Sequence, residues 1–105
     1  MDLETVTAAA FGASLRGFGV NLLVRDVPVQ AARLTAVFGM SAHRVSGDFA
    51  IMRYGAAVFQ LHADGTYHAN PYLGLLPEAG ARGAGCELRL YDSDPDAAAA
   101  LAEAH

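Results

Sequence analysis

Cysteine is almost absent from this 105-residue sequence, which contains only Cys86. A single cysteine excludes an intrachain disulfide, and it excludes a zinc module built from several cysteines. Because Cys86 stands in an apolar stretch, we expect it to be a small buried side chain and not a reactive thiol.

Positive charge is scarce as well. Seven Lys and Arg residues stand against 11 Asp and Glu residues, which gives a formal net charge of −4. The sequence therefore lacks the basic stripe of a nucleic-acid-binding protein. Its acidic residues are scattered singly, so it has no polyacidic tail either. A hydrophobic fraction of 53% with 17% charged residues is typical of a globular chain.

Several signatures of known function are also missing. The sequence contains no nucleophile elbow and no phosphate-binding loop, and its early glycines do not form a dinucleotide fingerprint. No apolar run approaches the about 20 residues that a membrane-spanning helix needs. The N-terminus lacks the basic region of a secretory signal. From these features we expect a cytoplasmic location.

What the sequence does contain is an internal repeat. Residues 19–26 (GVNLLVRD) and 85–92 (GCELRLYD) share Gly, Leu, an aliphatic residue and Asp in the same frame, at a constant offset of 66 residues. Each copy continues through a proline, Pro28 or Pro95, into an alanine-rich stretch. The repeat predicts two copies of a strand followed by a helix. The second copy is expected to be incomplete, because His105 falls inside its helix.

The first copy has room for a complete βαβββ module. Its predicted elements are a strand at 20–25, a helix at 29–38 and strands at 42–45, 49–54 and 57–62. In the second copy we expect a strand at 86–91 and a helix from about Asp96 onward. The fold class is therefore α+β, with a βαβββ module followed by an incomplete second module.

Four segments follow from this division of the chain. The predicted boundaries are an N-terminal arm at 1–18, the first module at 19–62, a connecting loop at 63–84 and the start of the second module at 85–105. In the arm, Thr5, Thr7, Gly12 and Ser14 interrupt any helix, so we expect an extended segment or a short turn. A connecting loop of this length tends to be functional or to cross between modules.

Four short motifs carry a resemblance to a known family. They are residues 21–26 (NLLVRD), 38–40 (FGM), 48–50 (DFA) and 61–67 (LHADGTY). In this order and spacing, and with the repeat, they resemble the vicinal oxygen chelate superfamily, which includes glyoxalase I, extradiol dioxygenases and bleomycin-resistance proteins. The resemblance implies tandem βαβββ modules, a small-molecule ligand in a concave sheet cavity, and a homodimer that pairs modules across subunits.

The metal-ligand positions implied by the resemblance are poorly filled. The metal enzymes of the superfamily place a His or Gln seven residues before the Asp that ends each opening strand. In this sequence those positions are Gly19 and Gly85, and the third ligand position, usually Glu, falls at or near Gln60. We therefore expect no metal cofactor and a small organic ligand bound as in the bleomycin-resistance branch.

Two other functions stay open. One is a metal-dependent lyase, isomerase or dioxygenase that holds Zn, Ni, Mn or Fe through displaced ligands at His62, Asp64 or Glu87. The other is a non-catalytic relic that only dimerises.

Strand alternation assigns residues to two faces. Val20, Leu22 and Val24, with Cys86, Leu88 and Leu90 in the second copy, should pack beneath the helices. In the superfamily the opposite face lines the ligand cavity, which gives six candidate ligand-binding residues: Asn21, Leu23, Arg25, Glu87, Arg89 and Tyr91. Gln60, at the third ligand position, and His62, beside Asp64, bring the candidates to eight. The alternative is that some of these face solvent, or that Glu87 forms an ion pair with Arg89 or Arg25.

The histidines allow two interpretations. His62 and His68 flank Asp64, and such a cluster can bind a metal or perform acid–base chemistry. Asp64-Gly65 is also a strong turn signal, so the same segment can be a structural turn. His43 and His105 are expected on the surface.

Overall fold

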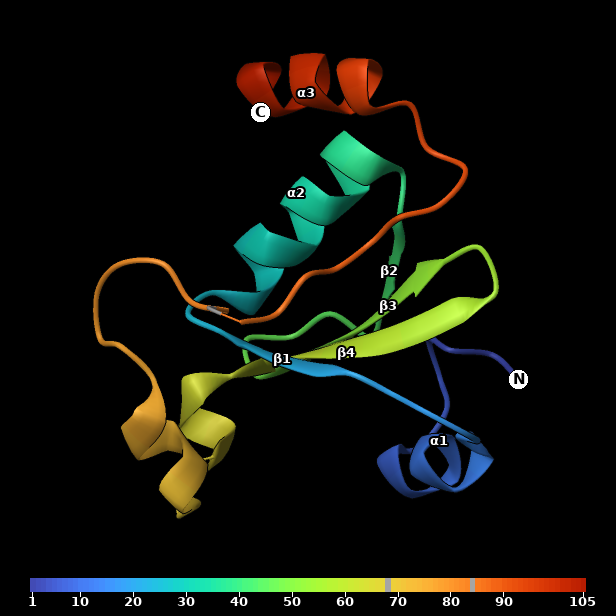
Figure 1. Cartoon of the computed structure of the whole chain (residues 1–105). Coiled ribbons are helices and arrows are strands. Elements are labelled where there is room, and N and C mark those ends of the chain that lie inside the picture. Colours follow the sequence, from blue (N-terminus) through green and yellow to red (C-terminus); the bar gives the residue numbers. More distant parts are fainter. Residues whose placement is uncertain (68, 84) are drawn as a thin grey trace.

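A four-stranded sheet forms the centre of the computed structural model, which describes residues 1–67, 69–83 and 85–105 (Figure 1). The strands β1 (Asn21–Val24), β2 (Ser41–His43), β3 (Phe49–Tyr54) and β4 (Ala57–Ala63) lie in the order β1-β4-β3-β2. β1 runs parallel to β4, and the other neighbours are antiparallel. Helix α2 (Val27–Phe38) connects β1 to β2, so the predicted βαβββ module and the α+β class are confirmed.

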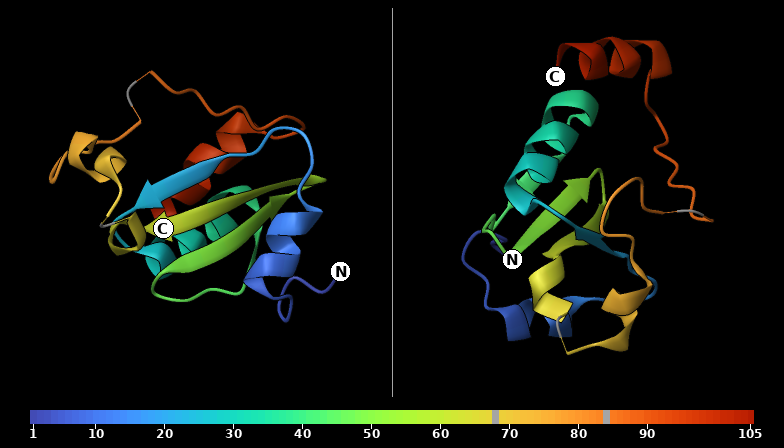
Figure 2. Two further views of the ribbon diagram at one scale, coloured as in Figure 1. Left: turned by 90° about the horizontal axis from the view of Figure 1, so that it is seen from below. Right: turned by 90° about the vertical axis from the view of Figure 1, so that its left-hand side faces the viewer.

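The remaining elements lie on both sides of this sheet. Figure 2 shows α2 and α3 (Pro95–Ala104) on one side and α1 (Ala8–Ser14) on the other, together with the 3-10 helices η1 (Asp64–Tyr67) and η2 (Pro71–Leu75). None of the described helices is long and apolar enough to cross a membrane.

Local sequence signals fix both ends of α2. The Asp26 carboxylate accepts a hydrogen bond from the backbone N–H of Val29 at 3.0 Å, and Pro28 stands in the first turn. The helix ends at Gly39, whose φ of 70° is the left-handed conformation that glycine adopts at low cost. Because Pro28 belongs to the first turn, α2 begins at Val27, slightly before the predicted start.

The core lies between α2 and the sheet. Every second residue of a strand faces the helix, and in β1 these are Leu22 and Val24, as predicted. They pack against a cluster of buried side chains that consists of Val27, Ala31, Met40, Ala50, Met52 and Leu61. Burial of this apolar surface is the main source of stability for the module.

The N-terminal arm differs from the prediction, because it contains the helix α1. Thr7, which was expected to interrupt a helix, instead caps it by accepting a hydrogen bond from the N–H of Ala10 at 3.1 Å. Phe11 anchors the helix on the sheet, where its ring meets that of Phe49 edge-on at 6.5 Å and is only 5% exposed. The tertiary contact of one aromatic side chain thus outweighs the weak local pattern.

Side chains hold the connecting loop against the sheet. The two terminal guanidinium nitrogens of Arg82 donate to the Asp64 carboxylate, at 2.6 and 2.7 Å. Arg25, at the end of β1, donates to the backbone carbonyls of Pro77 and Glu78. The turn interpretation of the segment after His62 agrees with η1. His68 lies outside the described residues.

The second copy of the repeat forms its helix but not its strand. α3 begins after the N-cap Asp94, whose carboxylate accepts from the N–H groups of Asp96 and Ala97. Residues 86–91, however, pair with no strand among residues 1–67, 69–83 and 85–105, so the predicted strand is wrong. Cys86 is exposed, which overturns its expected burial. Cys86, Leu88 and Leu90 were all expected to pack beneath the helices, but Leu88 is exposed as well, and of the three Leu90 packs against the core cluster.

Candidate functional site

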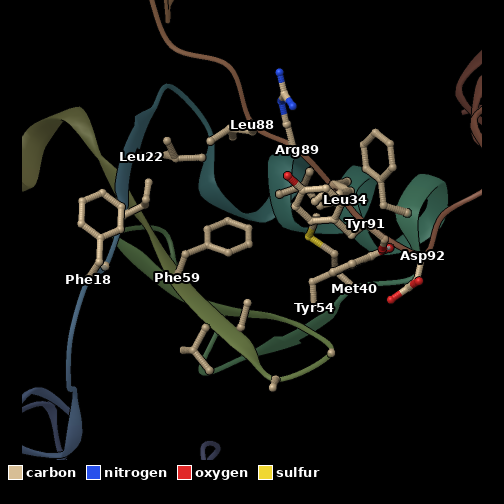
Figure 3. Close-up of a pocket in the computed structure, with 18 of the residues that line it drawn as sticks. Phe18, Leu22, Leu34, Met40, Tyr54, Phe59, Leu88, Arg89, Tyr91 and Asp92 are labelled. Carbon is tan, nitrogen blue, oxygen red and sulfur yellow. Dashed lines mark hydrogen bonds between the residues drawn. The ribbon is translucent and has the colours of Figure 1, made fainter.

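A cavity of about 750 Å³ lies between the sheet, α2 and the second copy of the repeat (Figure 3). Its size falls in the range of small-molecule sites, and most of its wall is apolar. The lining residues include Phe18, Leu22, Leu34, Met40, Tyr54, Phe59, Leu88, Arg89, Tyr91 and Asp92.

Beside β1 and the segment that leads into it, where Phe18 and Leu22 line the space, three further parts of the fold build the cavity. Phe59 of β4 and Tyr54 of β3 come from the antiparallel hairpin, where Gly55 makes the turn with a φ of 58°. Leu34 of α2 forms a second side. Leu88 and its neighbours form the third side, and Figure 3 shows Phe59 directed into the space between these groups.

Few polar groups reach this space. The Tyr54 hydroxyl donates a hydrogen bond to the backbone carbonyl of Tyr91 at 2.7 Å. Arg89 forms an ion pair with Glu87, and Figure 3 shows its guanidinium directed away from the aromatic rings. Its charge is therefore compensated by a neighbour on the same segment. The cavity is suited to hold a largely apolar molecule, and its polar lining residues include Gln30 and Asp92.

Two of the eight predicted ligand-binding residues, Arg89 and Tyr91, line this cavity. Four others meet on the opposite face of the sheet, because the parallel register pairs Asn21 with Gln60 and places Leu23 opposite His62. Leu23 is buried there, whereas Asn21 is exposed. The remaining two residues, Arg25 and Glu87, are bound to the connecting loop and to Arg89, respectively. Glu87 thus follows the ion-pair alternative.

On that opposite face, Gln60 and His62 form a polar pair. The Nε2 atom of His62 lies 3.0 Å from the Gln60 amide oxygen. The imidazole packs edge-on against the rings of Phe49 and Tyr67, at centroid distances of 5.2 and 5.6 Å. Burial lowers the pKa of His62 below its ordinary value of 6.5. A neutral ring at pH 7 can donate its Nε2–H to the Gln60 amide oxygen, so these two atoms are paired within the chain.

The residues at the superfamily's metal positions do not fit a metal centre. Gly19 and Gly85 have no side chain to offer, and the Gln60 oxygen already contacts His62. Of the displaced set, both Asp64 oxygens are bound by Arg82, which lowers the pKa of this carboxyl. Within the part of the chain that the structure describes, no three His, Cys, Asp or Glu side chains gather as a metal site would require.

The aromatic and apolar wall of the cavity was not identified from the sequence. Tyr54 and Phe59 stand at strand positions that share a face with the core residues, so alternation places them beneath α2. The cavity itself depends on the path of residues 88–92, for which the sequence carries no comparable signal.

Comparisons with known proteins give a limited result. No protein-family model matches the chain, and no curated protein matches it significantly. Among solved structures, the chain is similar to a glyoxalase/bleomycin resistance protein/dioxygenase family enzyme from Burkholderia phytofirmans PsJN. The two are 21% identical with a TM-score of 0.49, and the match covers 61% of this chain and 52% of that enzyme. The matched region therefore spans about half the length of the enzyme, a member of the group that the sequence motifs resemble.

Proposed function

We propose that this chain is a module of the glyoxalase/bleomycin-resistance type that binds a small, largely apolar organic molecule without a metal ion. The βαβββ topology, with β1 parallel to β4, supports the family assignment. The observation that carries the ligand class is the apolar cavity of about 750 Å³. The ligand site thereby moves to the α2 side of the sheet, away from the face that the resemblance implied.

The preferred ligand is uncharged. Glu87 already neutralises Arg89, and the other lining side chains are mostly hydrocarbon or aromatic. An anion placed among them would lose its hydration and be repelled by the carboxylate of Asp92, which also lines the cavity. For a cation, Asp92 is an exposed partner whose attraction is screened by water. An aromatic molecule gains dispersion contacts with the rings of Tyr54, Phe59 and Tyr91.

The test uses the uncharged fluorescent dye N-phenyl-1-naphthylamine. We expect saturable binding, seen as enhanced fluorescence, and a rise in Tm with dye concentration, because a ligand of the folded state stabilises it by mass action. Leu88→Ser should weaken binding about fivefold, since it removes roughly 1 kcal/mol of apolar contact from a half-exposed side chain. The matched control is Leu75→Ser, which alters another exposed leucine that does not line the cavity.

Two results would contradict this proposal. Equal binding by Leu88→Ser and Leu75→Ser would show that the dye binds elsewhere. Loss of binding after treatment with a chelator, with recovery on adding Zn, Ni, Mn or Fe, would favour the metal-dependent alternative.

A further inference from the structure

Residues 86–92, which we term the strap, form one wall of the cavity without belonging to the sheet. No strand in the described ranges pairs with the strap. Left-handed backbone conformations stand at both ends, with φ of 84° at Gly85 and 58° at Asp92. These are positions at which a chain can change direction within one residue.

Few contacts hold the strap in the described part of the chain. At its start, the backbone N–H of Cys86 donates to the carbonyl of Gly83 at 2.9 Å. Leu90 packs against the core cluster, and the Tyr54 hydroxyl donates to the Tyr91 carbonyl at 2.7 Å. Most of the other strap side chains are exposed: Leu88 is 57% exposed, Tyr91 is 71% exposed, and the Glu87–Arg89 pair lies at the surface. A segment attached by so few interactions opens at much lower cost than the sheet unfolds.

We infer that the strap is a movable wall of the ligand cavity and that Tyr54 is the positioning residue that latches it closed. The inference rests on the proposed function for the presence of a ligand, but the latch itself can be tested on the protein alone. A molecule in the cavity would contact Leu88 and Leu90 from inside, so its binding favours the closed strap.

Limited trypsin digestion, followed by mass spectrometry, measures strap opening directly. Arg89 is a cleavage site within the strap, and Arg33 of α2 reports global unfolding in the same sample. Tyr54→Phe should speed cleavage after Arg89 about fivefold, the change expected for one hydrogen bond. Cleavage after Arg33 should change less. Tyr91→Phe is the matched control, because it removes a hydroxyl from the strap and keeps the carbonyl that Tyr54 binds.

Adding N-phenyl-1-naphthylamine tests the coupling to ligand. The dye should slow cleavage after Arg89 in the unsubstituted protein, and stopped-flow mixing should show faster dye release from Tyr54→Phe than from Tyr91→Phe. Equal cleavage after Arg89 in the two variants would overturn the latch. Dye binding without protection of Arg89 would overturn the closing of the strap over ligand. If the dye does not bind but Tyr54→Phe still opens the strap, the proposed function fails and the latch stands.

Discussion

Residues 21–24 form β1 along the side of β4, whereas the equivalent residues 87–90 have no strand beside them in the described chain. The two segments share the same frame of Gly, Leu, an aliphatic residue and Asp. They differ in whether another strand lies beside them to accept and donate backbone hydrogen bonds. β4 pairs residue by residue with β1. In addition, the backbone N–H of Gln60 donates to the carbonyl of Val20, the residue just before β1, at 3.1 Å.

This difference shows that a segment with a strand-like sequence forms a strand only where a second segment lies beside it and pairs with its backbone. An extended chain leaves its backbone N–H and C=O groups unsatisfied unless another strand or water binds them. In the first copy these groups and the apolar face of β1 find partners in β4 and α2. In the second copy, residues 86–91 join no sheet within the described residues, and Leu90 is the side chain of this segment that packs against the core cluster there.

The largest effect on stability is expected in the core beside β1, and the matching substitution in the exposed second copy should have far less effect. Leu61 is fully buried and pairs with Leu22, so Leu61→Ala should lower the free energy of unfolding by about 2–5 kcal/mol. Leu88, the repeat equivalent of Leu22, is largely exposed, so Leu88→Ala should cost less than about 0.5 kcal/mol. Urea denaturation followed by circular dichroism measures both. Similar losses in the two variants would show that the second copy carries as much stability as the first.

The second expected effect concerns the loop between the copies. Arg82 binds Asp64 through two hydrogen bonds, so Arg82→Met should lower the free energy of unfolding by about 1–2 kcal/mol at pH 7, less than a buried ion pair because Asp64 is partly exposed. Arg16→Met is the control, since Arg16 donates to the neighbouring carbonyls of Ala13 and Leu15.

The same pair gives a dependence on pH with a definite sign. Arg82 lowers the pKa of Asp64 from its ordinary value of 3.8, so the ionised carboxylate stabilises the folded state above that pH. This contribution is lost as the pH falls through the lower pKa of the folded state. The difference in unfolding free energy between the unsubstituted protein and Arg82→Met should therefore be constant at neutral pH and shrink below pH 3.8. A difference that grows on acidification would contradict the assigned cause.

The sequence predicted those parts of the fold that depend on local signals and on a regular apolar period. The Asp26 cap and the Gly39 end of α2 each depend on residues that are close together in the sequence. β3 and β4 coincide with short apolar segments bounded by turn residues, so local patterns predict them as well. The α1 helix depends on Phe11 reaching Phe49, a contact between distant residues. The cavity likewise depends on Tyr54 bonding to Tyr91, 37 residues away. Neither contact leaves a pattern in the local sequence.

The smallest effect on stability is expected at the N-caps of the two helices α2 and α3. Asp26 caps α2, whose buried face joins the core, whereas α3 has no buried residue. Asp26→Ala should therefore lower the free energy of global unfolding by about 1 kcal/mol. Asp94→Ala should change it by less than about 0.5 kcal/mol, because α3 can fray without unfolding the sheet. Its effect should appear instead as faster hydrogen exchange at the amide of Ala98, which donates to the Asp94 carbonyl. If Asp94→Ala lowers global stability as much as Asp26→Ala, then α3 is part of the cooperative core, and the two copies contribute more equally than their packing indicates.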